Sequence, residues 1–246
     1  DGALTQLMWT RLGDCLLSAD SKGVVKYFNP SFHELHVEQL HQRKITGLTA
    51  SPNDSFFASS ALSDMIKITD LETCQHVSYL GQNENDRQDS CRLAWHSIHS
   101  LILSSMADST QKLWDPRSSK QICSIRNQHG EIVALEWAST NPYRWATISQ
   151  DSTTQIWDIR MLKSFYHWKP AAGMQTGKCL TWHPIHEQLL TIGTSGNIYF
   201  LDTMYQEHVG CITLSSDVRQ LDWNPLGHIL ASVGQDHFVY FWGQNL

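Results

Sequence analysis

The sequence predicts an all-β fold in which one unit is written six times. Each unit has a short alternating strand, a turn, a second strand, another turn and a third strand. The residues that mark the end of the first strand are spaced 41, 45, 42, 45 and 41 apart: Trp9, Ala50, Trp95, Trp137, Trp182 and Trp223. The residues that mark the end of the third strand follow after 19 positions in five units and 20 in the fourth: Phe28, Thr69, Trp114, Trp157, Leu201 and Trp242. Because this inner distance is nearly constant, we expect both turns of each unit to have a fixed length.

The segments within a unit alternate between apolar and polar residues as β-strands do, for example at 133–137, 145–149 and 154–157. A short fourth segment follows the third strand, as at 122–125 and 211–214. A period of 41–45 residues with four short strands is typical of WD-repeat β-propellers. We therefore predict a single WD40 β-propeller domain over 1–246, with repeats at approximately 4–43, 44–86, 90–128, 130–172, 177–214 and 216–246.

The count of strands leaves the ring one strand short. The last repeat stops at its third strand, 239–242, and the first residues already form the first strand of their own unit. Two explanations are open: an imperfect six-bladed ring, or six blades of a seven-bladed parent with exposed strand edges at the gap.

The composition excludes several classes of protein. No segment approaches eighteen consecutive apolar residues, so a membrane-spanning helix is not expected. Ten Trp, seven Tyr and eight Phe argue against long disorder. The net charge of −6 argues against a basic nucleic-acid coat. Six widely spaced cysteines without a C-x-x-C pair are expected to be buried apolar side chains in a reducing compartment: Cys15, Cys74, Cys91, Cys123, Cys179 and Cys211.

The fourth repeat contains His129, Thr147, Asp151 and Trp157, which permit two interpretations. A His/Asp pair near a hydroxyl could act as an acid–base pair in a nucleophilic triad. In WD-repeat proteins the equivalent residues instead form a hydrogen-bond chain from the Trp N–H through the hydroxyl and the His to the Asp, which fixes the turns. The recurrence of the pattern without a His favours the structural interpretation, since a catalytic group does not repeat around a fold: Ser104, Asp108 and Trp114, then Ser232, Asp236 and Trp242.

Three further histidines, His96, His183 and His186, lie in turns that follow a first strand. A metal site at His183 and His186 with Glu187 is conceivable, but the sequence does not place a third ligand beside the two histidines. Polar turn residues that cap a strand end are therefore the preferred interpretation. The chain has no phosphate-binding Gly loop, no H-E-x-x-H and no G-x-S-x-G. We predict no catalytic residue, no metal and no cofactor.

Two strings in the last two repeats resemble one family. They are LTWHPIHE at 180–187 and LDWNPLGHIL at 221–230, followed by QDH at 235–237. They are similar to the last two blades of the WD-repeat subunit of the mRNA cleavage and polyadenylation machinery, the polyadenylation factor subunit 2 family. Further segments earlier in the chain, at 18–27, 112–116 and 158–163, resemble the family in the same order along the sequence. Thr69 and Leu201 depart from the usual Trp.

The resemblance implies a non-catalytic, nuclear scaffold subunit in pre-mRNA 3′-end processing. Such subunits bind a larger propeller subunit and, with a zinc-finger subunit, help read the polyadenylation signal in RNA. The family's RNA contacts lie on a basic segment before the propeller and on its first blade. Asp1-Gly2 aligns with the loop before the second blade, so the resemblance favours a seven-bladed parent lacking its first blade. No RNA-binding residue is assigned, and this chain alone is expected to bind pre-mRNA weakly or not at all.

The alternative function is a generic WD-repeat adaptor that binds peptides in a ubiquitin-ligase or chromatin complex. Such an adaptor would place Arg and aromatic residues around the central channel. The basic residues Lys22, Lys26, Arg43 and Lys44 are expected to be solvated loop charges, because no aromatic-and-basic stretch that could stack bases surrounds them.

Overall fold

The computed structural model describes residues 2–62, 64–81, 90–126, 130–170 and 176–243. Its contacts divide the chain into two compact units, Asp1–Asn127 and Gln128–Leu246. The regular elements of both units are strands in antiparallel sheets. In the part of the chain that the structure describes, no helix is long and apolar enough to cross a membrane. The expectation that 1–246 forms one domain stays a prediction.

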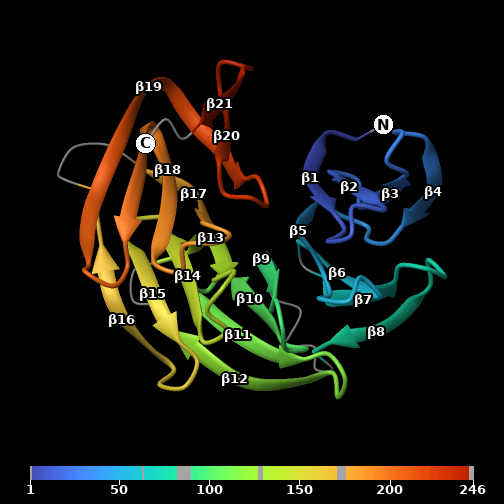
Figure 1. The fold of residues 1–246 in the computed structure, drawn as a ribbon. Helices are drawn as coiled ribbons and strands as arrows, with labels where there is room; N and C mark the ends of the chain where they lie inside the picture. The colour runs from blue at the N-terminus through green and yellow to red at the C-terminus, as the bar shows by residue number, and fades with distance from the viewer. Residues whose placement is uncertain (1, 63, 82–89, 127–129, 171–175, 244–246) are drawn as a thin grey trace. The chain divides into compact units, whose positions relative to one another are not determined.

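The first unit contains three four-stranded sheets, in each of which consecutive strands pair in chain order (Figure 1). The first sheet has β1 (Leu4–Trp9), β2 (Leu16–Asp20), β3 (Val24–Phe28) and β4 (Glu34–Gln39). The second has β5 (Ile45–Ala50), β6 (Phe56–Ala61), β7 (Ile66–Asp70) and β8 (His76–Leu80). The third has β9 (Ser90–Trp95), β10 (Ile102–Met106), β11 (Thr110–Asp115) and β12 (Lys120–Arg126).

The second unit contains one sheet of four strands and one of five. The four-stranded sheet has β13 (Ile132–Trp137), β14 (Arg144–Ser149), β15 (Thr154–Asp158) and β16 (Lys163–Trp168). The five-stranded sheet has β17 (Gly177–Trp182), β18 (Leu189–Asp202), β19 (Glu207–Trp223), β20 (Ile229–Gly234) and β21 (Val239–Gly243).

The structure has five sheets where the sequence predicts six repeats, so the count of six is not confirmed. The physical reason lies in β19, which is 17 residues long and drawn as one long arrow in Figure 1. Its first part pairs with β18, from Asp202↔Glu207 onward, and its last part pairs with β20, up to Trp223↔Leu230. The fourth strand of the fifth repeat therefore continues without a break into the first strand of the sixth, and this continuity joins two separately paired sets of strands into one five-stranded order. In the same way, β18 pairs with β17 through its first half and with β19 through its second half.

Burial differs between the strands of one sheet in a regular way. Every described position of β10 and β15 is buried, whereas β4 is exposed at five of its six positions. Within each unit neighbouring sheets pack against one another and bury their middle strands, whereas the fourth strand β4 is mostly exposed. Large side chains fill these interfaces, such as Phe57 and Trp114 in the first unit and Trp145 in the second. Each such buried side chain contributes about 1.5–3 kcal/mol relative to its exposed state.

The cysteines only partly match the expectation of burial. Cys179 is buried, Cys15, Cys74 and Cys123 are partly buried, and Cys211 is exposed, all five as free thiols. Cys211 is exposed because it lies in the outward-facing first part of β19, where apolar neighbours in the sequence do not ensure burial. The side chain of Cys91 lies outside the described part of the chain.

Candidate functional site

The backbone before His41 ties the first two sheets of the first unit together. After β4 ends, the N–H groups of Leu40 and His41 both donate to the carbonyl of Gly23, at 3.1 and 3.0 Å. Gly23 occupies the turn between β2 and β3 with φ 88°, a left-handed conformation that favours glycine. A Cβ at this position would lie 2.0 Å from the His41 carbonyl oxygen. The close approach of the two backbones therefore requires glycine.

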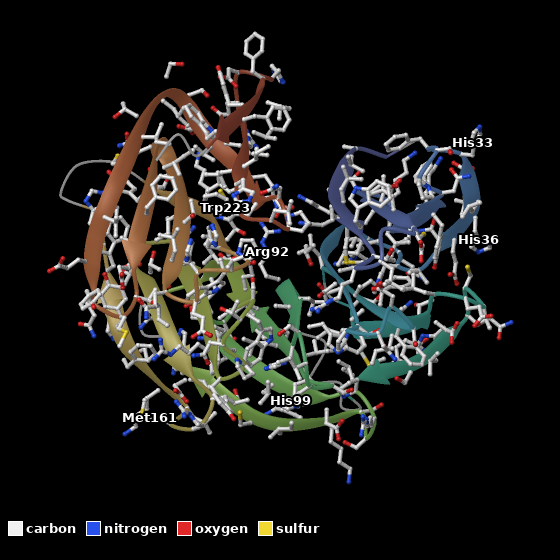
Figure 2. All side chains as sticks on the ribbon, in the orientation of Figure 1. His33, His36, Arg92, His99, Met161 and Trp223 are labelled. Atoms are coloured by element: carbon white, nitrogen blue, oxygen red, sulfur yellow. The ribbon has the colours of Figure 1, made fainter. Side chains whose placement is uncertain are left out.

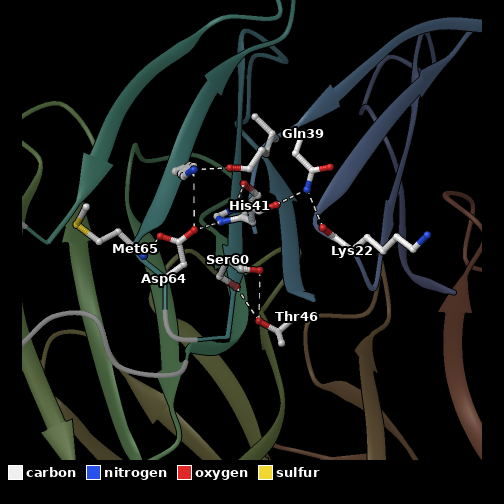
Figure 3. Close-up of polar contacts among 10 residues, drawn as sticks. Lys22, Gln39, His41, Thr46, Ser60, Asp64 and Met65 are labelled. Carbon is white, nitrogen blue, oxygen red and sulfur yellow. Dashed lines mark hydrogen bonds and ion pairs between the residues drawn. The ribbon is translucent and has the colours of Figure 1, made fainter. Parts of the chain in front are cut away.

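The side chain of His41 joins two groups of the second sheet (Figure 3). Its Nδ1 lies 2.7 Å from Oδ2 of Asp64, which follows β6, and its Nε2 lies 2.8 Å from Oγ of Ser59 on β6. Ser59 is 0% exposed and His41 is 1% exposed. The result is a continuous chain of hydroxyl, imidazole and carboxylate, with its first two groups buried.

The charges of this chain follow from burial and hydrogen bonding. Burial, and secondarily the positive charge of Lys67, lowers the pKa of His41, so the ring is neutral at pH 7. A neutral ring has one donor nitrogen. Because the Asp64 carboxylate can only accept, Nδ1 carries the proton and Nε2 accepts the hydrogen of the Ser59 hydroxyl. Burial alone would raise the pKa of Asp64, but hydrogen bonds from His41 and from the Met65 N–H hold it below its ordinary value.

The order Ser59, His41, Asp64 is that of a hydrolytic triad, in which a His activates a hydroxyl nucleophile. A nucleophile must reach a substrate, and Ser59 and His41 have essentially no exposed surface. The chain of hydrogen bonds instead holds β6, the turn after it and the segment after β4 at fixed positions. This arrangement is a structural device.

In the fourth repeat, the indole N–H of Trp157 donates to the Thr147 hydroxyl at 2.9 Å. The carboxylate of Asp151 accepts from the N–H and the hydroxyl of Thr153, at 2.9 and 2.8 Å, and its side chain is 38% exposed. His129 lies outside the described residues. The structure thus brings Trp157 and Thr147 together, and the link through His129 to Asp151 stays a prediction.

In the third repeat, the indole N–H of Trp114 donates to the Ser104 hydroxyl at 2.8 Å. Ser104 in turn contacts the Lys112 carbonyl at 3.5 Å. Asp108 accepts from the N–H and the hydroxyl of Thr110, at 3.0 and 2.6 Å. The Trp–Ser bond and the Asp turn are therefore two separate devices in this repeat.

The last repeat follows the same scheme. The indole N–H of Trp242 donates to the Ser232 hydroxyl at 2.9 Å. Asp236 accepts instead from the Ser216 hydroxyl at 2.8 Å and from the Tyr240 hydroxyl at 2.9 Å. Asp236 thereby connects β19 with β21, a role that the sequence pattern does not predict.

The fifth repeat shows how the fold compensates for a missing Trp. Leu201 stands at the Trp position and has no N–H to offer. The hydroxyl of Thr191, which is fully buried, accepts instead from the indole N–H of Trp223 on the neighbouring strand β19, at 3.1 Å. A buried hydroxyl without a partner is costly, and the bond from Trp223 supplies the partner that Leu201 cannot.

Sequence reasoning missed Ser59, His41 and Asp64, although one signal for them was readable. His41 precedes Ser59 by 18 residues, the same spacing that separates His129 from Thr147. Thr69 in place of Trp concealed the equivalence.

The predicted turn role of His96 is confirmed by its hydrogen bonds. The ring is 1% exposed, and its Nδ1 accepts from the backbone N–H groups of Ile98 and His99, at 2.9 and 3.0 Å. His99 itself is exposed and labelled in Figure 2. An acceptor aimed at two N–H groups stabilises the tight turn that follows β9.

His183 forms the same kind of turn cap after β17. Its Nδ1 accepts from the N–H groups of Ile185 and His186, at 3.1 and 2.9 Å, and its Nε2 lies 3.1 Å from the Gly227 carbonyl. Burial lowers the pKa of His183, so the ring stays neutral, with its proton on the nitrogen facing that carbonyl. Across the described residues, no group of three or more His, Cys, Asp or Glu side chains could hold a metal ion.

Polar side chains of the first strands meet within the first unit. Arg92 of β9, labelled in Figure 2, donates through Nη1 to the Thr46 carbonyl of β5 at 3.2 Å. Gln6 of β1 donates to the same carbonyl at 3.4 Å. One carbonyl therefore holds side chains from the first strands of both neighbouring sheets.

Comparison with known proteins agrees with this geometry. A family model described as WD domain, G-beta repeat, matches residues 203–243. Polyadenylation factor subunit 2 of Gibberella zeae is 29% identical over 99% of this chain and 44% of its own length. The chain resembles polyadenylation factor subunit 2. The protein of the same name from Saccharomyces cerevisiae is 27% identical over 52% of this chain and 28% of its own length. The predicted resemblance is confirmed, and the chain spans less than half the length of these relatives.

A solved structure shows the same fold. A chain in the crystal structure of the mitotic checkpoint complex superposes with a TM-score of 0.85, covering 98% of this chain and 76% of that chain at 19% sequence identity. This likeness concerns the fold alone. The protein has an all-β WD40 β-propeller fold, with five blades among the residues that the structure describes, and no catalytic family is indicated.

Proposed function

We propose that this chain is a non-catalytic WD-repeat interaction subunit in pre-mRNA 3′-end cleavage and polyadenylation. The observation that carries the proposal is the similarity to polyadenylation factor subunit 2 over 99% of the chain. The burial of Ser59 and His41 supports a non-catalytic role, because the one triad-like arrangement found among the described residues is closed to substrates.

The finer features of the proposal follow from the family resemblance. The chain binds a large propeller subunit and a zinc-finger subunit in the nucleus, and the assembled complex positions the polyadenylation signal of the RNA. The six sequence repeats are part of a seven-bladed parent. Lys22 and Arg43 are exposed, and Lys26 forms an exposed ion pair with Glu34 at 2.8 Å, which supports their role as solvated loop charges. This chain alone therefore binds RNA weakly or not at all.

Affinity purification of the tagged chain from nuclear extract, followed by mass spectrometry, tests the proposal. Recovery of cleavage and polyadenylation subunits, absent from a purification with the tag alone, is the expected result. Filter binding with RNA that contains or lacks a polyadenylation signal is run in parallel. Absence of those subunits, or tight signal-dependent RNA binding by the isolated chain, would contradict it.

The second candidate is a peptide-binding adaptor in a ubiquitin-ligase or chromatin complex. It is favoured by Arg92, which lies on a first strand and contacts the neighbouring first strand. The same purification separates the two candidates, because ubiquitin-ligase or chromatin subunits would be recovered in place of polyadenylation subunits.

A further inference from the structure

A pocket of about 370 Å³ lies between the second and third sheets of the first unit. Its volume falls in the range of ligand pockets, about 300–1,000 Å³. Phe56, Ile68 and Val77 of the second sheet supply an apolar wall. Trp95 at the end of β9 and Arg117 in the turn after β11 line the side that belongs to the third sheet.

Trp95 is distinguished from other Trp side chains by its unused donor. It is 6% exposed, and its indole N–H has no hydrogen-bond acceptor among the described residues. Five other indole N–H groups donate to acceptors inside the protein: those of Trp114, Trp157, Trp182, Trp223 and Trp242. Buried polar groups are normally paired. The indole nitrogen itself has essentially no accessible surface, so Trp95 contributes other atoms of its ring to the pocket wall.

The charge of the lining selects the kind of acceptor. Arg117 is the single charged residue that lines the pocket, and no carboxylate is among the lining residues. The nearby carboxylate of Asp115 is occupied, because it accepts from the Arg117 backbone N–H at 3.0 Å and from the Ser118 hydroxyl at 2.8 Å. The guanidinium of Arg117 is exposed, and its charge, after the hydrogen bond from Ser118, helps to lower the pKa of Asp115 without a direct ion pair being formed between the two described side chains.

The remaining polar side chains also suit an acceptor-rich ligand. Hydroxyls of Ser78, Ser100 and Ser119 line the pocket beside the apolar wall. A carboxylate with apolar neighbours uses both features, since it accepts several hydrogen bonds while the rest of the segment covers the wall. A polyanion such as RNA requires many cationic contacts. In this pocket RNA would meet a single cationic side chain, that of Arg117, on a chain with a net charge of −6.

We propose that this pocket binds a carboxylate of a partner protein's acidic peptide segment beside Arg117, with the apolar part of the segment against Phe56, Val77 and the Trp95 ring. The carboxylate is either an Asp or Glu side chain or the C-terminus of the partner. The site rests on the geometry of the first unit and does not depend on the proposed role in polyadenylation.

Titration by nitrogen–proton NMR tests the site, with the Trp95 indole resonance assigned by its loss in Trp95→Phe. Three peptide probes have apolar flanks: one blocked at both ends with a central glutamate, one blocked with glutamine in its place, and one with glutamine and a free C-terminus. The glutamate or the free-carboxylate peptide is expected to shift the Trp95 resonance at millimolar concentration and to bind roughly fivefold or more tightly than the blocked glutamine peptide. Which of the two binds identifies the source of the carboxylate.

Matched variants separate recognition from folding. Arg117→Gln is expected to abolish the preference for carboxylate while the resonance of buried Trp114 stays unchanged, because Arg117 is exposed. Arg43→Gln removes an equally exposed charge outside the pocket lining and should leave binding unchanged. The site is overturned by equal affinity for all three peptides, by no Trp95 shift with either acidic peptide, or by a Trp95 shift with single-stranded RNA at lower concentration than with peptide.

Discussion

Replacement of Asp64 by alanine tests the buried chain of hydrogen bonds most directly. The substitution removes the acceptor of His41 Nδ1–H, and His41 is 1% exposed, although the Asp64 side chain is itself 32% exposed, so water that enters its place can recover part of the lost bond. Leaving a buried donor unpaired costs about 1–3 kcal/mol, and more when the lost partner was charged. The Met65 N–H also loses its acceptor at 2.8 Å, and the Lys67 ion pair at 3.9 Å adds at most about 1 kcal/mol. We expect Asp64→Ala to lower the free energy of unfolding by about 2–4 kcal/mol.

Urea unfolding followed by Trp fluorescence measures this change, and a thermal melt should show a fall in Tm of roughly 4–16 °C, from about 2–4 °C per kcal/mol at this size. Asp108→Ala is the control, since this exposed turn carboxylate accepts only from Thr110 and its loss should cost about 1 kcal/mol of stability or less.

The pKa of Asp64 is lowered from 3.8, so the contribution of Asp64 to stability is present above pH 3.8 and disappears as the pH falls through the lower folded-state pKa. The difference between wild type and Asp64→Ala should therefore narrow in acid. An Asp64→Ala protein within about 0.5 kcal/mol of wild type, or equal to the control, would refute the reasoning.

Three further substitutions have defined outcomes. Gly23→Ala places a Cβ 2.0 Å from the His41 carbonyl at φ 88°, so we expect a loss of about 2–4 kcal/mol by urea unfolding, and a loss under 1 kcal/mol would contradict the backbone argument. Trp157→Phe removes the N–H bound by the fully buried Thr147 hydroxyl and should lower stability by about 1–3 kcal/mol in the same assay. Burial, and then a neighbouring carboxylate, raises the pKa of Glu136 from 4.5 to about 8, so wild type loses stability as the pH rises through that window. Thermal melts of Glu136→Gln should therefore match wild type near pH 5 and exceed it near pH 9, and a constant difference would count against the raised pKa.

Much of the strand layout is local and was therefore readable. The expected strands 145–149 and 154–157 lie within one residue of the observed β14 and β15, because alternation and turn length act over a few residues. The bond from Trp157 to Thr147 also lies within one sheet and follows from the repeat spacing. The sheet count did not follow, because the continuity of β19 depends on how the last two repeats meet.

The sequence by itself determined the repeat, the fold class and the resemblance to polyadenylation factor subunit 2, since each is written in the spacing and identity of residues along the chain. Tertiary structure alone decided which polar groups meet. His41 joins Ser59 and Asp64 from separate segments, and the unpaired indole of Trp95 and the charge of Arg117 line one pocket between two sheets. Hydrogen bonding and burial depend on distances across sheets, and these distances exist only once the sheets have packed.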